Sequence, residues 1–407
     1  MNTSSYESPQ QADATASKRS VAFDNTQIAF AHRSHADLRR AWLLFRMLGK
    51  PQLVRIGKPL TALAFQFGLP IKPLIRETLF KQFVGGETIA ECEKTIQELA
   101  NYQIGSILDY SAEGKDDENS FEQTTQELIA ILDRSASDRR IPFAVFKPTG
   151  LASAELLAKA SQWQNLTPEE TQALNRFKQR VETICSHAVK VQTPVLVDAE
   201  ESWLQGICDQ VVLDMMMRFN QERAWVWNTL QMYRTDRLAY LRDLIEISQK
   251  KQFHLGFKLV RGAYMEKERE QALKQGITSP IQPCKADTDR AFDQALELCL
   301  KHIDRVAICS GSHNETSNYL LMDLMRSQGL AKNDSRIWFA QLLGMSDHIS
   351  FNLSAAGYNV VKYVPYAPIR DLMPYLMRRA EENTSVAGQS SRELDLLQAE
   401  MKRRRLL

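Results

Sequence analysis

Several patterns that would classify this chain quickly are missing from it. The two cysteines nearest in sequence, Cys299 and Cys309, are ten residues apart, so no CxxC pair indicates a zinc ribbon or a redox dithiol. The patterns GxGxxG, GxxxxGK[ST], GxSxG and HExxH are also absent, which argues against a Rossmann domain, a P-loop and the matching hydrolase and zinc-protease sites. Excess charge is lacking too: 51 basic and 49 acidic residues give +2, so nucleic acid is not an expected partner.

The N-terminus lacks an apolar core. Residues 1–20 are polar, which excludes a signal peptide or a membrane span there, and Lys18 and Arg19 are too few basic residues for a transit peptide. We expect residues 1–36 to form a disordered tail. Six cysteines without a framework spacing indicate reduced thiols, and therefore a cytoplasmic protein that could lie at the periphery of the inner membrane.

Short β-branched or aromatic runs alternate with helix-periodic stretches over most of the chain. The predicted strands are Ile104–Asp109, Phe143–Lys147, Pro194–Asp198, Trp225–Gln231, Gly256–Val260, Arg305–Cys309, Ile337–Gln341 and Asn359–Tyr363. The predicted helices are Phe121–Arg134, Ala154–Val191, Trp203–Phe219, Arg234–Gln249, Asp287–Lys301, His313–Arg326 and Pro374–Glu382. Strands joined through helices pair in parallel, and eight evenly spaced units favour an α/β (βα)8 TIM-type barrel over a doubly wound open sheet.

Segments flank the predicted barrel on both sides. Helical spacing from Asp37 to Leu79, interrupted by prolines, and again from Ile89 to Tyr102 predicts a helical arm over residues 37–102. The barrel then occupies residues 103–385, and residues 386–407 form a basic C-terminal tail.

Polar side chains follow at least six of the eight predicted strands, where (βα)8 barrels place their chemistry. They are Lys147, Asp198, Gln231, Lys258, Arg261, Gly262, His313, Asn314, Lys362 and Tyr363. Taken singly, a lysine can be a solvated charge, an acid can belong to the first turn of a helix, and a histidine can be a cap. Their common location at one rim favours an active site.

The last predicted barrel helix carries two adjacent arginines. Tyr375 precedes Arg378 by three residues and Arg379 by four, so the phenol can share a helix face with the guanidinium groups. Arginine offers a planar fork of donors that suits a carboxylate. A solvated arginine pair on an ordinary surface helix explains the same residues equally well.

Together these segments resemble the proline dehydrogenase family of flavin-dependent (βα)8 enzymes, across roughly Asp109 to Asn383. The resemblance lies in VLVDAEES (195–202), NTLQMYR (228–234), FKLVRGAYMEKERE (257–270), GSHNE (311–315) and KYVPYAPIRDLMPYLMRRAEEN (362–383). It departs from some relatives at Lys258, where arginine is frequent, and at Met265, where some carry tryptophan.

The resemblance assigns roles residue by residue. It implies that Arg378 and Arg379 pair with the substrate carboxylate, and that Leu259 lies beneath the proline ring. The remaining substrate-pocket residues that it implies are Lys147, Asp198, Tyr264, Tyr363 and Tyr375. The implied FAD contacts are Gln231, Lys258, Val260, Arg261, Gly262, His313 and Asn314, with Lys258 near flavin N5.

The implied activity is oxidation of L-proline to 1-pyrroline-5-carboxylate in proline catabolism, with FAD as hydride acceptor and quinone as the next acceptor. A weak contact with anionic membrane is expected from the tail, where Leu394, Leu397 and Met401 form an apolar stripe before the basic run 402–405. Three alternatives stay open: oxidation of 4-hydroxyproline, a Schiff-base lyase that uses Lys147, Lys258 or Lys362, and a barrel that only binds its ligand.

Overall fold

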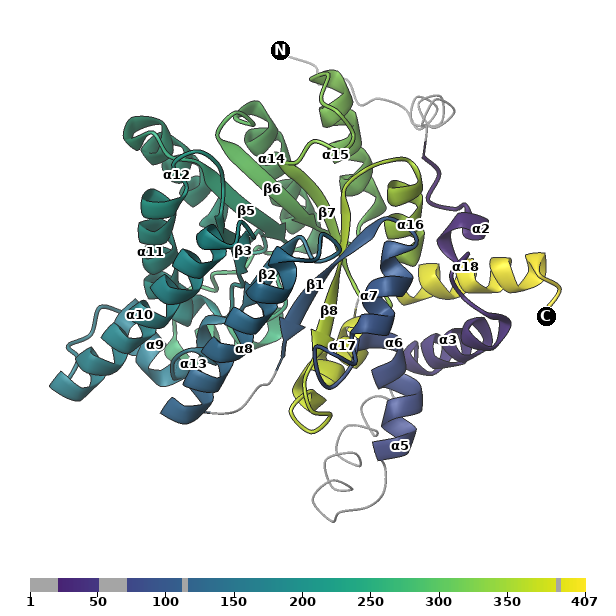
Figure 1. Cartoon of the computed structure of the whole chain (residues 1–407), viewed down its shortest axis with the longest axis horizontal. Coiled ribbons are helices and arrows are strands. Elements are labelled where there is room, and N and C mark those ends of the chain that lie inside the picture. The colour runs from purple at the N-terminus through teal and green to yellow at the C-terminus, as the bar shows by residue number, and fades with distance from the viewer. Residues whose placement is uncertain (1–20, 51–71, 112–115, 386–388) are drawn as a thin grey trace.

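The computed structural model describes residues 21–50, 72–111, 116–385 and 389–407. Eight parallel strands form a closed barrel in chain order, so the predicted fold class is confirmed (Figure 1). Every predicted strand corresponds to an observed one. The strands are β1 (Ile104–Tyr110), β2 (Phe143–Phe146), β3 (Val195–Val197), β4 (Val226–Gln231), β5 (Leu255–Val260), β6 (Val306–Gly311), β7 (Ile337–Leu342) and β8 (Val360–Tyr366).

Helices surround the barrel. Those within and after the barrel region are α7 (Glu93–Ala100), α8 (Glu118–Ala136), α9 (Ala154–Ser161), α10 (Pro168–Lys190), α11 (Ser202–Phe219), α12 (Arg237–Lys251), α13 (Met265–Gln275), α14 (Lys285–Lys301), α15 (Glu315–Ser327), α16 (Asp347–Ala355), α17 (Met373–Ser385) and α18 (Gln389–Arg403). Before them come α2 (Thr26–Ala29), α3 (His35–Leu48), α5 (Lys72–Ile75), the π-helix η1 (Arg76–Phe80) and α6 (Lys81–Phe83).

Three features of the helical pattern in the barrel region differ from the prediction, and the first is that α13 was not among the predicted helices. The single helix expected over Ala154–Val191 is two helices, because Thr167 caps α10 in a capping box with Glu170 and Pro168 occupies the first turn. The sequence pattern also did not indicate α16. All of its residues from Asp347 to Ser354 are buried, so it lacks the one-sided apolar stripe that reveals an amphipathic helix.

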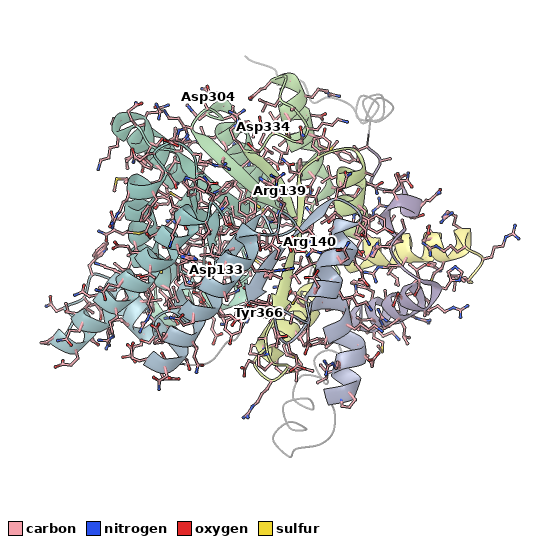
Figure 2. All side chains as sticks on the ribbon, in the orientation of Figure 1. Asp133, Arg139, Arg140, Asp304, Asp334 and Tyr366 are labelled. Carbon is pink, nitrogen blue, oxygen red and sulfur yellow. The ribbon has the colours of Figure 1, made fainter. Side chains whose placement is uncertain are left out.

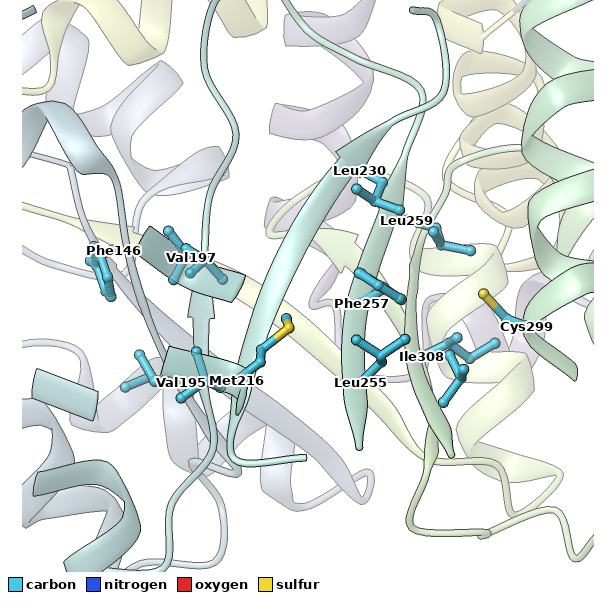
Figure 3. Close-up of a cluster of buried hydrophobic side chains, with 14 of the residues drawn as sticks. Phe146, Val195, Val197, Met216, Leu230, Leu255, Phe257, Leu259, Cys299 and Ile308 are labelled. Carbon is cyan, nitrogen blue, oxygen red and sulfur yellow. The ribbon is translucent and has the colours of Figure 1, made fainter. Parts of the chain in front are cut away.

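Side chains alternate between the inside and the outside of the barrel along each strand. On β5, Leu255, Phe257 and Leu259 belong to the large apolar cluster between the strands and the surrounding helices (Figure 3). The interior is closed near the N-terminal ends of the strands by aromatic rings, where Phe143 packs edge-on against Trp227 at a centroid distance of 5.2 Å. Polar side chains therefore occupy the interior only toward the C-terminal ends.

The opposite face of the barrel carries charged loops. Arg139 and Arg140 precede β2, Asp304 precedes β6, and Asp334 precedes β7 (Figure 2). Arg140 lies 2.7 Å from Asp138 in an ion pair. Polar residues at the N-terminal face of a barrel usually serve stability rather than chemistry. The active site is therefore expected at the C-terminal ends of the strands.

The first described residues are packed and not disordered. Phe23 and Phe30 are buried, and Arg33 forms a 2.7 Å ion pair with Asp347 of α16. The prediction of a disordered tail is therefore wrong for residues 21–36, since these aromatic side chains are buried by folding. Residues 1–20 lie outside the described part of the chain.

The C-terminal helix packs against the N-terminal arm. Leu397 and Met401 are buried in a cluster with residues of α3, and the half-buried Leu394 packs against the same cluster. Figure 1 shows α18 in yellow beside α3 in purple. The apolar stripe is thus covered by the protein itself, and the prediction that it faces a membrane is wrong. Among the described helices, none has the length and hydropathy needed to cross a bilayer.

Candidate active site

A connected set of charged and phenolic side chains fills the upper interior of the barrel. Lys258 Nζ lies 2.5 Å from Asp198 Oδ1 and donates to the Tyr363 hydroxyl at 2.8 Å. Lys147 Nζ donates to Asp109 at 2.9 Å and lies 3.7 Å from Asp198 Oδ2. These residues come from five strands. Four of them, β8, β1, β2 and β3, are consecutive around the barrel, and β4 separates β3 from the fifth, β5. We call these five side chains the interior polar cluster.

The interior polar cluster is electrically balanced and sets its own protonation. Burial raises the pKa of Asp109, but Lys147 and a hydrogen bond from Ser111 outweigh this effect and hold that pKa below its ordinary value. Burial, followed by the nearby Asp198 carboxylate, raises the pKa of Tyr363 well above its ordinary value. Tyr363 is therefore a neutral phenol at physiological pH.

Asp109 was not among the predicted site residues. It lies near the C-terminal end of β1, where it pairs with Lys147, and only 4% of its surface is exposed. The signal that could have found it is the same as for Asp198, namely an acid at the end of an apolar strand. Because Asp109 lies on the first strand, before the alternation of strands and helices becomes clear, this signal was overlooked.

The ends of β4 to β6 leave backbone and hydroxyl groups facing the interior. Gly262 has φ +131°, and a Cβ there would lie 2.5 Å from the Tyr233 ring; a Cβ on Gly311 would lie 2.9 Å from Val260 Cγ1. Thr229 Oγ1 is buried without a hydrogen-bond partner among the described residues. Tyr233 and Val260 therefore exclude a side chain at these two positions, and the Thr229 hydroxyl is a buried polar group that a ligand at this rim can satisfy.

Gln231 joins this region to the end of β3. Its side-chain amide donates to the Glu200 carbonyl oxygen at 2.6 Å, and only 3% of the residue is exposed. Gln231 and Val260 are neighbours in the paired strands β4 and β5. The predicted cofactor residues of β4 and β5 are therefore adjacent in space.

Arg261 points toward the helices around the rim. Its guanidinium donates to Asp289 of α14 at 2.6 Å, to Ser312 at 3.0 Å and to Ser317 of α15 at 2.9 Å. It also lies over the Phe292 ring. Arg261 thus ties the end of β5 to two helices, which is a structural task in addition to any ligand contact.

His313 and Asn314 lie between β6 and α15. The His313 Nδ1 atom is 2.9 Å from Ser346 Oγ, while the Asn314 side chain accepts from the Ser317 backbone N–H and caps α15. Burial, together with the nearby cations Lys362 and Arg379, lowers the pKa of His313 to about 3. The imidazole is neutral at physiological pH, and Arg379 is near enough to influence it.

Two predicted residues point out of the barrel. Leu259 is fully buried with Phe257 in the outer cluster and cannot lie beneath a substrate in the interior (Figure 3). The Lys362 ammonium is also fully buried outside the strands, 3.0 Å from Asp347 of α16. Both corrections have one cause: the neighbours Lys258 and Tyr363 face inward, so strand alternation turns Leu259 and Lys362 outward.

The predicted carboxylate clamp lies on α17. The Arg379 guanidinium stacks over the Tyr375 ring at 5.1 Å, both residues are buried, and Arg378 is half-buried. Tyr375 belongs to a cluster that also contacts Leu342 of β7, and Leu342 contacts the interior cluster that contains Tyr363. The clamp helix is therefore packed onto the mouth of the barrel.

Tyr264 is held at the start of α13. The residue is half-buried and occupies the position before the first helical residue. Glu268, one turn later, is buried and accepts hydrogen bonds from the backbone N–H and the hydroxyl of Ser202, both at 2.6 Å. This contact fixes α13 against α11, and thereby fixes where Tyr264 stands.

Glu200 is a second acid that the site prediction missed, although it lies two residues after Asp198. Its carboxyl group accepts hydrogen bonds from the Thr149 hydroxyl at 2.5 Å and from the Thr149 backbone N–H at 2.9 Å, two residues after Lys147. Burial raises the pKa of Glu200 to about 7, although the Thr149 hydrogen bonds act in the opposite direction. The carboxyl group is therefore protonated in the folded protein below neutral pH.

This shift predicts a pH dependence of stability. Between pH 4.5 and 7 the folded state holds a proton on Glu200 that the unfolded state has lost, so the free energy of unfolding falls as pH rises. Glu200→Gln should remove on the order of 2–3 kcal/mol of this fall. Urea unfolding of both proteins at pH 5 and pH 8 measures the difference. Parallel changes in the two proteins would show that Glu200 titrates normally.

Fold and rim together define a (βα)8-barrel enzyme with its active site at the C-terminal ends of the strands. The sequence matches a model of the proline dehydrogenase family over residues 92–392. The chain belongs to the proline dehydrogenase family, a family of oxidoreductases.

Relatives whose names state different activities are similar to this chain. A carbapenem antibiotics biosynthesis protein, CarD, from Pectobacterium carotovorum is 35% identical, covering 79% of this chain and 83% of its own. Hydroxyproline dehydrogenase of Xenopus laevis is 31% identical over 92% of this chain and 88% of its own. Human mitochondrial proline dehydrogenase 1 is 37% identical, but over 58% of this chain and 40% of its own.

Solved structures confirm the fold. Proline utilization A (PutA) from Bdellovibrio bacteriovorus superposes with a TM-score of 0.71 at 18% identity. The match covers 93% of this chain and 40% of the PutA chain, so this chain spans less than half of that protein. The likeness extends beyond the strands to the flanking helices.

Proposed function

We propose that this protein oxidises L-proline to 1-pyrroline-5-carboxylate with FAD as the oxidant, the first step of proline catabolism. The observation that carries the proposal is the interior polar cluster, in which Lys258 contacts both Asp198 and Tyr363, together with a buried arginine on α17, the helix at the mouth of the barrel. Family membership supplies the reaction class.

The residues present fit a flavin. Gly262 and Gly311 leave backbone without side chains at the ends of β5 and β6, and the buried Thr229 hydroxyl has no hydrogen-bond partner among the described residues. Gln231 and Lys258, on the paired strands β4 and β5, offer donors to a ring system. His313 and Asn314 lie beyond β6 on the same rim. When bound, FAD supplies the two-electron acceptor that the protein side chains lack.

The chain's own residues bind and orient the substrate. Arg378 and Arg379 pair with its carboxylate, and Tyr264, Tyr363 and Tyr375 enclose the ring and exclude water. Asp198 keeps acceptor capacity toward the substrate nitrogen, because only one of its oxygens is engaged closely by Lys258. The Lys258 ammonium stabilises negative charge that develops beside it during the oxidation.

The Schiff-base alternative is disfavoured by the same contacts. A nucleophilic lysine must lose its proton, but Lys147 is paired with Asp109, and Lys258 with Asp198. Both amine nitrogens are therefore engaged in ion pairs, which oppose attack on a carbonyl group. Lys362, the third candidate, does not reach the interior at all.

Anaerobic mixing tests the proposal. The purified protein loaded with FAD should lose its visible flavin absorbance when L-proline is added, with 1-pyrroline-5-carboxylate as the product. Sodium borohydride should trap no lysine adduct. A flavin spectrum that proline leaves unchanged, or a trapped adduct, overturns the proposal in favour of ligand binding alone or of lyase chemistry.

Oxidation of 4-hydroxyproline is the second candidate, because relatives named hydroxyproline dehydrogenase match over 92% and 93% of this chain. We favour proline because the phenol of Tyr363 crowds the interior, where it is buried and held by Lys258. The same anaerobic assay with both amino acids compares them directly.

Tyr363→Ser should narrow the gap in kcat/KM between proline and 4-hydroxyproline by roughly tenfold, since it removes the ring that would meet the extra hydroxyl group. Tyr363→Phe is the matched control, because it keeps the ring and should keep the gap. Steady-state kinetics with both substrates measure the effect. A gap that stays constant in the serine variant would show that another residue sets the preference.

The proposal extends to a membrane quinone as the acceptor of the electrons. The buried apolar stripe of α18 leaves Lys402, Arg403 and Arg405 as the exposed cations that could meet anionic lipid. Turnover with a soluble quinone analogue, and sedimentation with anionic vesicles at low and high salt, test these two parts separately.

A further inference from the structure

Two consecutive side chains of the C-terminal helix α18 reach the loops behind the predicted cofactor residue His313. Arg392 lies 2.8 Å from Glu315, two residues after His313. Glu393 accepts a hydrogen bond from the backbone N–H of Ser346, which precedes α16. Ser346 in turn contacts His313 through its hydroxyl group, 2.9 Å from Nδ1. A continuous chain of contacts therefore leads from α18 to the imidazole.

The central link of this chain is strained and buried. Ser346 has φ +51° and ψ +43°, a left-handed conformation that residues other than glycine rarely adopt, and it is fully buried. Its N–H needs an acceptor, since a buried unsatisfied donor is costly. The Glu393 carboxyl group, itself 4% exposed, provides that acceptor.

Ionisable groups of both signs surround Glu393. His348 lies 4.0 Å from Glu393 and 3.1 Å from Glu315, while Asp347 between the two loops is paired with Lys362 and Arg33. These contacts come from five separate parts of the chain, namely the N-terminal segment, α15, α16, β8 and α18.

We propose that Glu393 is a positioning residue for the cofactor site: through the Ser346 amide it fixes the Ser346 hydroxyl, which orients the His313 ring toward FAD. This inference rests on the proposed function for the identity of the ligand. It makes α18 part of the cofactor site, although the helix lies behind that site and follows the clamp helix α17 in the chain.

The packing role of α18 can be tested separately from the proposed positioning role of Glu393. Leu396, Leu397 and Met401 pack in a cluster with residues of α3, on the other part of the helix, and a change at Glu393 leaves that packing in place. Asp395 is exposed on the same helix, so Asp395→Ala is a matched control that also removes one carboxylate.

The first experiment needs no cofactor. The apo-protein labelled with 15N-histidine gives ring nitrogen shifts that report the tautomer and the hydrogen bonding of His313, assigned with His313→Gln. Glu393→Ala should change the His313 shifts, whereas Glu393→Gln, which keeps an acceptor oxygen, and Asp395→Ala should leave them near those of the parent. Unchanged shifts in Glu393→Ala overturn the inference.

The second experiment measures FAD affinity by quenching of flavin fluorescence in the reconstituted apo-protein. The Kd should rise about tenfold or more in Glu393→Ala, as expected for the loss of a charge-assisted hydrogen bond, and less than about threefold in the two other variants. A changed histidine signal with unchanged Kd also overturns the inference. If the parent protein binds no FAD, the proposed function fails instead, while the histidine shifts still decide whether Glu393 sets His313.

Discussion

Arg379→Met is expected to raise the KM for proline about tenfold or more while the flavin content stays normal, because a charge-assisted bidentate pair contributes roughly 1.5–3 kcal/mol. The buried guanidinium is preorganised by stacking on Tyr375, so little conformational freedom remains to be lost on binding. Steady-state kinetics and the flavin absorbance of the purified variant provide the two measurements.

Arg379→Lys separates charge from shape. Lysine keeps the positive charge but not the planar fork, so its KM should lie between those of the parent and the methionine variant. The thermal unfolding temperature of each variant checks that α17 remains packed. An unchanged KM in Arg379→Met would show that Arg379 does not bind the substrate carboxylate.

Lys258→Met should lower kcat at saturating proline by about a hundredfold or more, since it removes the cation nearest to the developing charge in the interior polar cluster. The change also leaves Asp198 with two more distant partners, Lys147 at 3.7 Å and the Tyr363 hydroxyl at 3.5 Å. Single-turnover reduction of the flavin by proline measures the chemical step directly, apart from reoxidation.

Stability must be measured in parallel, because removing one partner from a buried ion pair costs about 3–5 kcal/mol. Lys258→Arg restores the charge and should recover most of the rate, as the resemblance to family members with arginine at this position suggests. A methionine variant that folds and reduces its flavin within about threefold of the parent rate would contradict the role of Lys258.

The strands could be predicted from the sequence because each is a short apolar run bounded by helix or turn signals. Helices with one apolar face were equally visible. The residues of α16 were not, since burial on all sides removes the periodic signal, and the division between α9 and α10 depended on a cap at Thr167 that apolar spacing does not reveal. Apolar periodicity reveals helices that are buried on one side. It reveals neither a helix buried on all sides nor a boundary set by a helix cap.

The sequence pattern predicts which residues lie at the C-terminal ends of the strands. It does not predict whether each of these residues faces the interior or the exterior of the barrel. Lys258 and Leu259 are adjacent in sequence, yet one contacts Asp198 inside and the other packs with Phe257 outside. Which of two neighbours faces inward depends on the register with the adjacent strands, here Lys258 beside Thr229 and Cys309. One sequence does not state that register.

The contacts between the two ends of the described chain have a consequence for the order of folding. Arg404 donates hydrogen bonds to the backbone carbonyls of Phe30 and Arg33, at 2.8 and 2.7 Å, and α18 covers α3. During synthesis, residue 30 emerges from the ribosome long before residue 404 exists. The apolar face of the nascent N-terminal segment therefore stays uncovered until α18 has been synthesised, a period in which chaperones can bind it.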